Sequence, residues 1–306
     1  MPDAPALVAL CPSRDADRVA AATGLDPAVV AYHLDAGNCY RLGSDVLVIE
    51  AVLASPLSLP TAWLLHVPTH LLVEGWPELS AAMEALFPVR RVVARVPTGS
   101  LGTPQDAVAG FAFYDHWVVR APTDEPRSSP VDERFSLAAP ATAADWAFVH
   151  AALKWSLAGG MAIVRPEQPL SDEEFRRYLR DELADAQSIV ATVGGVLVGH
   201  LTWNVRPDRL TRVPTALIID SFVDAEHRSL GISKRLVAEL ETRCGRAGTP
   251  MAGTVLGDER EVHLGRLQHG GWEHRYDRWG CYPWPAPVAV DVAERDQVSQ
   301  LTGPRL

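Results

Sequence analysis

The sequence Val223-Asp-Ala-Glu-His-Arg228-Ser-Leu-Gly231-Ile-Ser233 carries the strongest structural signal in this chain. It follows an apolar, β-branched run from Thr215 to Val223, which is typical of a buried central strand. It leads into an amphipathic pattern over residues 231–246, which predicts a helix. A tight turn between a strand and a helix leaves backbone N–H groups unpaired at the positive end of the helix dipole. Such a turn is a suitable site for a pyrophosphate.

The side chains of this turn fit the same role. Gly231 lets the backbone come close to a phosphate, Ser233 is small, and Arg228 adds positive charge at the entrance. The sequence therefore predicts a phosphate-binding turn between this strand and this helix.

This stretch resembles the signature of the GNAT acetyltransferase family, which is Arg/Gln-x-x-Gly-x-Gly/Ala after a strand that ends in Val-x-Pro-Glu. The matching positions are Val223, Glu226, Arg228, Gly231 and Ile232. Ala225 stands where the family has proline, and Ser233 stands where it has glycine or alanine. The order of predicted helices and strands over residues 133–285 resembles the family as well.

The resemblance implies that acetyl-CoA or another acyl-CoA is the acyl donor, with its pantetheine along the strand that ends at Val223. The residues implied in cofactor binding are Phe222, Val223, Arg228, Ser229, Leu230, Gly231, Ile232, Ser233 and Lys234. The implied reaction is direct attack by an amine on the thioester in a ternary complex, and the simplest acceptor is a small-molecule amine.

Two alternatives to this function stay open. One is a transferase that takes its acyl group from an acyl carrier or an aminoacyl-tRNA, held by the basic residues between Arg206 and Arg235. The other is a protein that binds coenzyme A without catalysing a reaction, because part of the family's proton-handling set is missing.

Asp220 is the predicted general base. It follows an apolar run from Ala216 to Ile219, and a carboxylate in such a strand must be paired or face a cleft. The alternative is a structural carboxylate that pairs with Arg212 or Arg228. His200, on the preceding strand, is the second candidate.

The usual proton donor of the family is absent. By resemblance, Leu267 takes the place of its tyrosine and Arg260 that of its asparagine. His263 and His269 are the candidates to replace it, but they point in different directions because they lie six residues apart on one predicted helix. We place His263 among the predicted catalytic residues. No metal site is predicted, since no compact ligand spacing occurs among His263, His269, His274 and Cys281.

A linker divides the chain. Residues 121–132 hold three prolines among small polar residues and cannot form a core element. The predicted organisation is a domain over 1–120, this linker, an acyltransferase domain over 133–285 and a tail over 286–306. The predicted fold class is α/β, with a mixed, mostly antiparallel sheet flanked by helices.

The two halves share an order of predicted elements and a short similar sequence. Tyr114-Asp-His-Trp117 and Tyr276-Asp-Arg-Trp279 both lie in the last strand of their half, which predicts an internal duplication and hence tandem GNAT-like domains. The turn Pro68–Gly75 of the first half lacks the glycine spacing and carries no arginine. We therefore predict a degenerate N-terminal copy and one coenzyme A per chain.

Local signals predict several further boundaries. A helix is expected from Thr142 to Leu157, ending at Gly159-Gly160, and a capping box at Ser171 opens a second helix to about residue 184. Gly194-Gly195 predicts a hairpin turn. A helix is also expected near 103–110.

Composition limits the class of protein. A chain of 306 residues with 47% hydrophobic residues fits two domains with real cores. The net charge of −10 argues against broad nucleic-acid binding, which depends on neutralising phosphates. No apolar stretch approaches the length of a membrane span, and the four cysteines are sparse, as expected for reduced thiols in a cytoplasmic protein. A homodimer is left open.

Overall fold

The computed structural model describes residues 6–52, 57, 59–98, 100, 111–123, 135–164, 169–255 and 260–281. Its N-terminal elements are β1 (Val8–Ala9), α1 (Pro12–Thr23), α2 (Pro27–Asp35), β2 (Cys39–Leu42), β3 (Asp45–Val52), β4 (Thr61–His66), α3 (Thr69–Val73), α4 (Trp76–Glu84), β5 (Arg91–Pro97) and β6 (Ala112–Arg120). Its C-terminal elements are β7 (Phe135–Ala138), α5 (Ala143–Val164), α6 (Asp172–Asp181), β8 (Gln187–Val193), β9 (Val196–Pro207), β10 (Pro214–Val223), the 3₁₀-helix η1 (Ala225–Leu230), α7 (Ile232–Ala247), β11 (Met251–Val255), α8 (Arg260–His269) and β12 (Glu273–Cys281).

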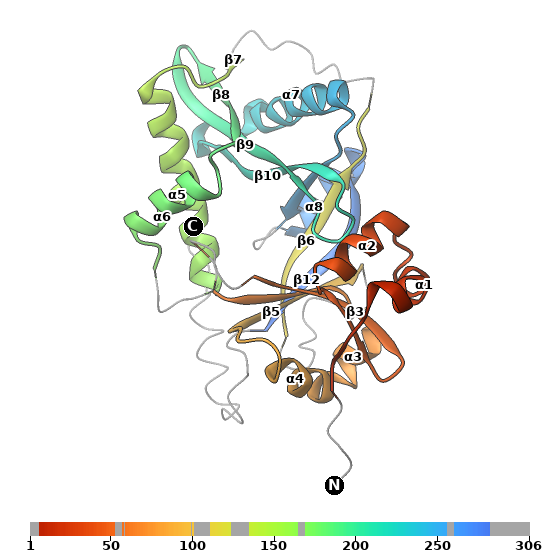
Figure 1. Ribbon diagram of the computed structural model, residues 1–306. Coiled ribbons are helices and arrows are strands. Elements are labelled where there is room, and N and C mark those ends of the chain that lie inside the picture. Colours follow the sequence, from red (N-terminus) through yellow and green to blue (C-terminus); the bar gives the residue numbers. More distant parts are fainter. Residues whose placement is uncertain are drawn as a thin grey trace.

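The predicted fold class is confirmed, because the strands form a mixed, mostly antiparallel sheet with helices beside it (Figure 1). The sheet has 12 strands in the order β1-β2-β3-β4-β5-β12-β6-β11-β10-β9-β8-β7. The parallel pairs among the described strands are β4–β5 and β10–β11. They occupy equivalent places in the two halves of the strand order.

The two halves exchange their last strands. β12, from the C-terminal half, lies between β5 and β6, while β6, from the N-terminal half, lies between β12 and β11. The exchange extends into the cores: Trp279 of β12 packs in the N-terminal cluster, and Val118 of β6 packs in the C-terminal one. Each half therefore contributes one strand to the sheet and to the core of the other half. The proposed bounds 1–120 and 133–285 and the duplication remain predictions.

The two similar segments, Tyr114–Trp117 and Tyr276–Trp279, lie beside each other on the paired strands β6 and β12. In the antiparallel register of β6 and β12, Asp115 faces Arg278 and His116 faces Asp277. Nε of Arg278 donates to Oδ1 of Asp115 at 2.6 Å, and Nδ1 of His116 lies 2.8 Å from Oδ1 of Asp277. Each aspartate thus pairs with the basic residue of the other segment. Opposite charges across paired strands favour one register over its neighbours.

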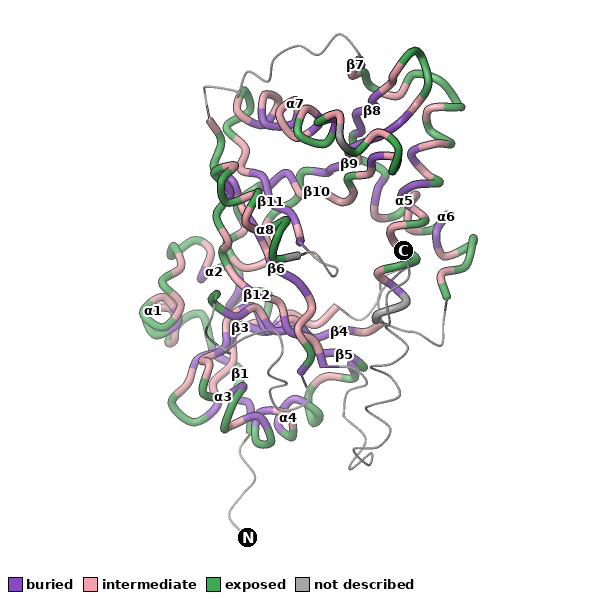
Figure 2. The backbone as a smooth tube through the Cα atoms, turned by 180° about the vertical axis from the view of Figure 1, so that it is seen from behind, coloured by how far each residue is buried: buried purple, intermediate pink, exposed green. Residues whose placement is uncertain are grey.

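Buried residues are most frequent along the strands, whereas the helices include many exposed residues (Figure 2). The N-terminal core includes β3 and β4, where Leu47, Ile49 and Leu64 are almost fully buried. The C-terminal core joins β8, β9 and β10 to α7 through residues such as Ile189, Leu201 and Leu236.

Helix α5 is longer than predicted. The helix was expected to end at Gly159-Gly160, but it continues to Val164. Met161, only 8% exposed, packs beside Leu57 of the N-terminal half. Burial of this side chain offsets the cost of two helical glycines, which is roughly 1 kcal/mol each relative to alanine.

Gly159→Ala is expected to stabilise the protein by about 0.5–1 kcal/mol, because alanine restricts the unfolded chain. A Cβ at Gly159 would meet no atom within 4 Å, so the folded state accepts it. Urea denaturation of the two proteins measures the change. A lower midpoint for the variant would show that α5 is interrupted here.

Some of the other predicted element boundaries are confirmed, and some helices of the structure were not predicted. The capping box at Ser171 and the hairpin turn at Gly194-Gly195 are confirmed. The helices α1 and α3 were not predicted, although Pro12 is suited to the first turn of α1. The expected helix near 103–110 and the tail 286–306 lie outside the described residues.

Within the described ranges, no helix has the length and apolarity needed to cross a membrane.

Candidate functional site

Among the described residues, β10 and β11 pair only where the two strands begin. Ala216 pairs with Met251 and Leu217 with Ala252, and the described residues form no further pair between these strands. β10 continues along β9, and β11 continues along β6. The backbone of β10 after Leu217 therefore has no strand partner on one side. An open strand edge offers N–H and C=O groups to a ligand that lies along it.

A β-bulge interrupts β10 beside this opening. Ile218 pairs with Trp203 and Asp220 with Thr202, which leaves Ile219 as an extra residue. A bulge bends its strand and redirects the side chains next to it, and bulges are frequent beside active sites.

The opening corrects the prediction of a buried central strand. Thr215, Ala216 and Val223 are buried, but Asp220 and Phe222 are only partly buried. Their strand has lost its neighbour on one side, because β11 diverges from it. The apolar pattern indicated a strand correctly, but it did not reveal this divergence.

The turn after β10 has the features expected of a phosphate site. Gly231 has φ 74°, which favours glycine, and no side chain caps the start of α7. A Cβ at Gly231 would meet no atom within 4 Å, so the space above the turn is open. Nε of the exposed Arg228 donates to the carbonyl oxygen of Val223 at 3.2 Å. The first turn of α7 has no acidic residue, and Lys234 is exposed there.

The corresponding turn of the N-terminal half is closed. A Cβ at Gly75 would lie 2.9 Å from a methyl carbon of Leu71 and 3.2 Å from its Cα. Pro77 in the first turn of α4 also lacks a backbone N–H. The contrast between Gly75 and Gly231 supports the prediction of a single phosphate site, which remains a prediction.

Asp220 and His200 lie together on adjacent strands. Nε2 of His200 is 3.1 Å from Oδ2 of Asp220, and their side chains are 0% and 10% exposed. The two atoms are close enough for a hydrogen bond but lack its angle, and neither has another hydrogen-bond partner among the described residues. Among the described residues, these two polar atoms thus have each other as close neighbours. The alternative pairing of Asp220 with Arg212 or Arg228 does not occur among the described ion pairs.

A buried chain of polar groups extends from this pair. Nδ1 of His200 lies 3.1 Å from Oγ1 of Thr202, which lies 2.8 Å from Oγ of Ser188. If Thr202 donates to Nδ1, the proton of His200 is on Nε2, on the side of Asp220. His200 then acts as a positioning residue for the carboxylate. Sequence reasoning missed Thr202 and Ser188, although Thr202 lies two residues from His200 on the same strand face.

Tyr178 of α6 is a further polar group near Asp220. Burial raises the pKa of Tyr178 to about 12, and the carboxylates of Glu182 and Asp220 contribute to the rise. The phenol therefore keeps its proton at neutral pH. Tyr178 also packs in one cluster with Ile219, the bulge residue. The sequence offered no signal that Tyr178 lies near Asp220, because Tyr178 belongs to a helix far from the turn in sequence.

Aromatic rings cover the same face of β10. Phe222 contacts Phe148 and Trp155 of α5 with ring centroids 6.2 Å apart in each case. Trp155 is 68% exposed, which is unusual for so large an apolar side chain. These rings and Asp220 form a partly exposed surface that combines an apolar wall with a carboxylate.

His263 does not join this group. It is exposed on α8, a helix that packs on β11 and β12. Leu267 of the same helix packs against the C-terminal core, as an apolar residue at the family's tyrosine position would. His263 stays an untested prediction, and its position gives it no support.

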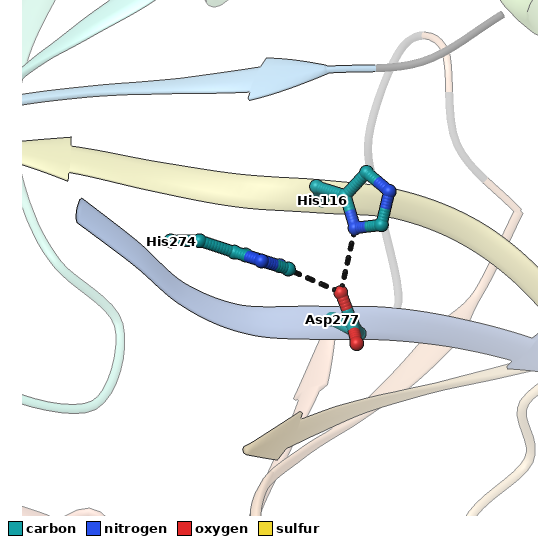
Figure 3. Close-up of side chains that lie close together, drawn as sticks. All are labelled: His116, His274 and Asp277. Carbon is teal, nitrogen blue, oxygen red and sulfur yellow. Dashed lines mark hydrogen bonds and ion pairs between the residues drawn. The ribbon is translucent and has the colours of Figure 1, made fainter. Parts of the chain in front are cut away.

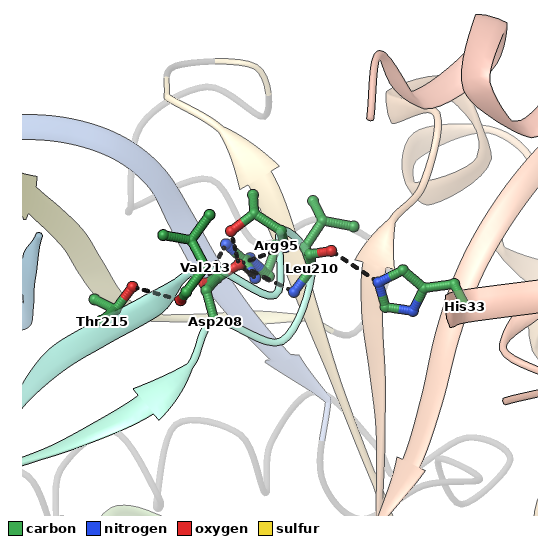
Figure 4. Close-up of polar contacts among 7 residues, drawn as sticks. His33, Arg95, Asp208, Leu210, Val213 and Thr215 are labelled. Atoms are coloured by element: carbon green, nitrogen blue, oxygen red, sulfur yellow. Dashed lines mark hydrogen bonds and ion pairs between the residues drawn. The ribbon is translucent and has the colours of Figure 1, made fainter. Parts of the chain in front are cut away.

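The hairpin between β9 and β10 contacts the N-terminal half (Figure 4). Arg209 pairs with Glu50 at 2.7 Å, and Arg212 lies over the ring of Tyr32 at 4.2 Å. Arg206, near the end of β9, pairs with Glu182 at 2.9 Å. These arginines are thus engaged within the chain, which weighs against the alternative in which they hold a tRNA or an acyl carrier.

His33 makes one contact of this hairpin sensitive to pH. Its Nε2 lies 2.7 Å from the carbonyl oxygen of Leu210, and burial lowers the pKa of His33 below 6.5. The neutral form is favoured in the folded protein. Its contribution to stability is therefore complete above the unfolded pKa and is lost as the pH falls toward the folded pKa.

His33→Gln is expected to make the fall in Tm between pH 8 and pH 5 shallower, because glutamine can donate to the same carbonyl but does not titrate. Thermal unfolding across this range measures both slopes. Burial also lowers the pKa values of His66 and His150, so part of the fall should remain. Parallel curves for the two proteins would contradict the role of His33.

A second polar cluster lies between β6 and β12 (Figure 3). Oδ1 of Asp277 is 2.8 Å from both Nδ1 of His116 and Nε2 of His274. Nε2 of His116 is 3.1 Å from Oε1 of Glu261 on α8. Burial disfavours a charge on His116, but the bonds to Asp277 and Glu261 raise its pKa overall. The prediction of no metal site considered His274 but not His116, which is distant in sequence.

Residues 155–264 match the profile of the Acetyltransferase (GNAT) family. This range includes the bulge in β10, Asp220 and the open turn at Gly231. The chain contains a GNAT domain.

The chain is also similar to solved structures. A GCN5-related N-acetyltransferase from Sphaerobacter thermophilus is 15% identical, with a TM-score of 0.56, and the match covers 96% of this chain and 99% of that chain. A GCN5-related N-acetyltransferase from Kribbella flavida is 14% identical, with a TM-score of 0.45, over 81% of this chain and 88% of that chain. The first likeness shows the fold over both halves. No curated protein matches the chain.

Proposed function

We propose that this GNAT protein is an acyl-CoA-dependent N-acyltransferase that acylates a small-molecule amine by direct attack in a ternary complex. The observation that carries the proposal is the placement of Asp220 and His200 at the bulge, beside the open edge of β10. A carboxylate held beside an open strand edge suits proton removal from an incoming ammonium group.

The turn after β10 fits the donor's pyrophosphate. Gly231 leaves open space, the start of α7 offers N–H groups, and Arg228 and Lys234 add positive charge. When bound, an acyl-CoA supplies an acyl group activated as a thioester. Phe222 and Val223 lie on the free edge of β10, where backbone groups can orient the pantetheine.

Asp220 accepts the proton of the acceptor amine in this proposal. His200 positions the carboxylate through Nε2, and Thr202 holds the other ring nitrogen. Tyr178 keeps its phenolic proton at neutral pH and is a candidate donor to the leaving sulfur, a role that Leu267 cannot fill. A thiolate has a pKa of roughly 8.5 and leaves without strong assistance, so this donor is helpful and not essential.

The proposal is tested with purified protein, acetyl-CoA and a panel of primary amines. Release of free thiol, together with the mass of the acylated amine, measures the reaction. Binding of one coenzyme A per chain without thiol release for any amine would favour the non-catalytic alternative. Absence of coenzyme A binding would overturn the proposal as a whole.

A further inference from the structure

The cluster between β6 and β12 joins the two exchanged strands. His116 comes from β6, whereas His274 and Asp277 come from β12. The three ligand atoms all lie within 4.8 Å of one another, and the side chains of His116, His274 and Asp277 are 5%, 8% and 11% exposed. Two imidazole nitrogens thus lie near one carboxylate oxygen, in a site with little exposure to solvent.

His116 has a carboxylate at each ring nitrogen. Asp277 lies at Nδ1 and Glu261 lies at Nε2. A neutral imidazole has one N–H donor, so it can satisfy only one of the two carboxylates. At the other nitrogen, either a second proton or a bound metal ion would relieve the repulsion between the lone pair and the carboxylate. A hydrogen bond from Nε2–H to Glu261 would leave the lone pair of Nδ1 directed toward Asp277.

We propose that His116, His274 and Asp277 bind a divalent transition-metal ion, with zinc as the expected metal. Two imidazoles and a carboxylate form a ligand set that zinc accepts, with a fourth position left for water or another ligand. Glu261 is the outer carboxylate that orients the ring of His116, an arrangement common at zinc sites.

The geometry needs an adjustment at each pair of ligand atoms, and the largest is at the two imidazole nitrogens, which lie within 4.8 Å of each other and must come closer. Zinc–nitrogen distances of about 2.0–2.1 Å place tetrahedral ligand atoms about 3.3 Å apart. The two contacts of 2.8 Å to Asp277 must therefore widen by about half an ångström. Because the ligands come from both exchanged strands, the metal would tie the last strand of one half to that of the other.

Zinc titration by calorimetry, followed by thermal unfolding, tests the proposal without using activity. The protein is first freed of metal with a chelator, and Cys11→Ser serves as the background because Cys11 is an exposed thiol. We expect one zinc ion per chain and a rise in Tm of about 5 °C at a hundredfold excess over Kd.

Three variants locate the site. His274→Gln keeps a donor for Asp277 but removes the ring nitrogen, so it should lose zinc binding. Glu261→Gln, at a 65% exposed side chain, should fold normally and bind zinc about 10–100-fold more weakly. His269→Ala, at an exposed position on the same helix as Glu261, should bind as the parent does. No zinc binding by the parent, or unchanged binding by Glu261→Gln and His274→Gln, would overturn the proposal.

Discussion

Gly231→Glu is expected to abolish coenzyme A binding while leaving the fold intact. The new carboxylate would stand in the open space above the turn, where the donor's pyrophosphate is proposed to lie. Two like charges 4 Å apart repel by about 4 kcal/mol at an effective dielectric of 20, which corresponds to roughly a thousandfold in Kd. Calorimetry with coenzyme A measures the loss.

Gly248→Glu is the matched control. Gly248 ends α7 with φ 61°, and a Cβ there would meet no atom within 4 Å. This variant introduces similar backbone strain and the same charge at the opposite end of the same helix. Equal losses in both variants would show that strain or net charge is responsible, and unchanged affinity in a folded Gly231→Glu protein would contradict the proposed phosphate site.

Asp220→Asn is expected to lower turnover by about 10²–10⁴, the usual contribution of acid–base catalysis. The amide keeps the shape of the side chain and an oxygen acceptor beside His200, so the fold should persist. Much of the activity should return at high pH, where the amine loses its proton in solution. The rate of thiol release as a function of pH measures both effects.

Asp208→Asn is the control for this prediction. Asp208 is also a largely buried carboxylate, but it pairs with Arg95 at the hairpin, away from the bulge. Its replacement should affect stability and leave the pH profile of turnover unchanged. Normal turnover in Asp220→Asn, or a loss that high pH does not reduce, would favour a structural role for Asp220.

Local signals in the sequence predicted many of the elements correctly. The capping box at Ser171 and the turn at Gly194-Gly195 depend on contacts within a few residues, and both are present. The turn at Gly231 is equally local, since the need for a positive φ lies in one residue. The end of α5 was wrong because Met161 packs against Leu57, a contact that no local pattern encodes.

The sequence by itself determined most of the strands and helices and the turn proposed to bind phosphate, because periodicity and caps act within one element. The tertiary structure alone decided which strands are neighbours. Alternating apolar residues tell a strand which face to bury, but not whether β6 or β12 lies beside β11. Asp115 and Arg278, 163 residues apart, help to select that pairing through a buried ion pair. The same pairing brings His116 to Asp277, and the divergence of β10 from β11 exposes the edge beside Asp220.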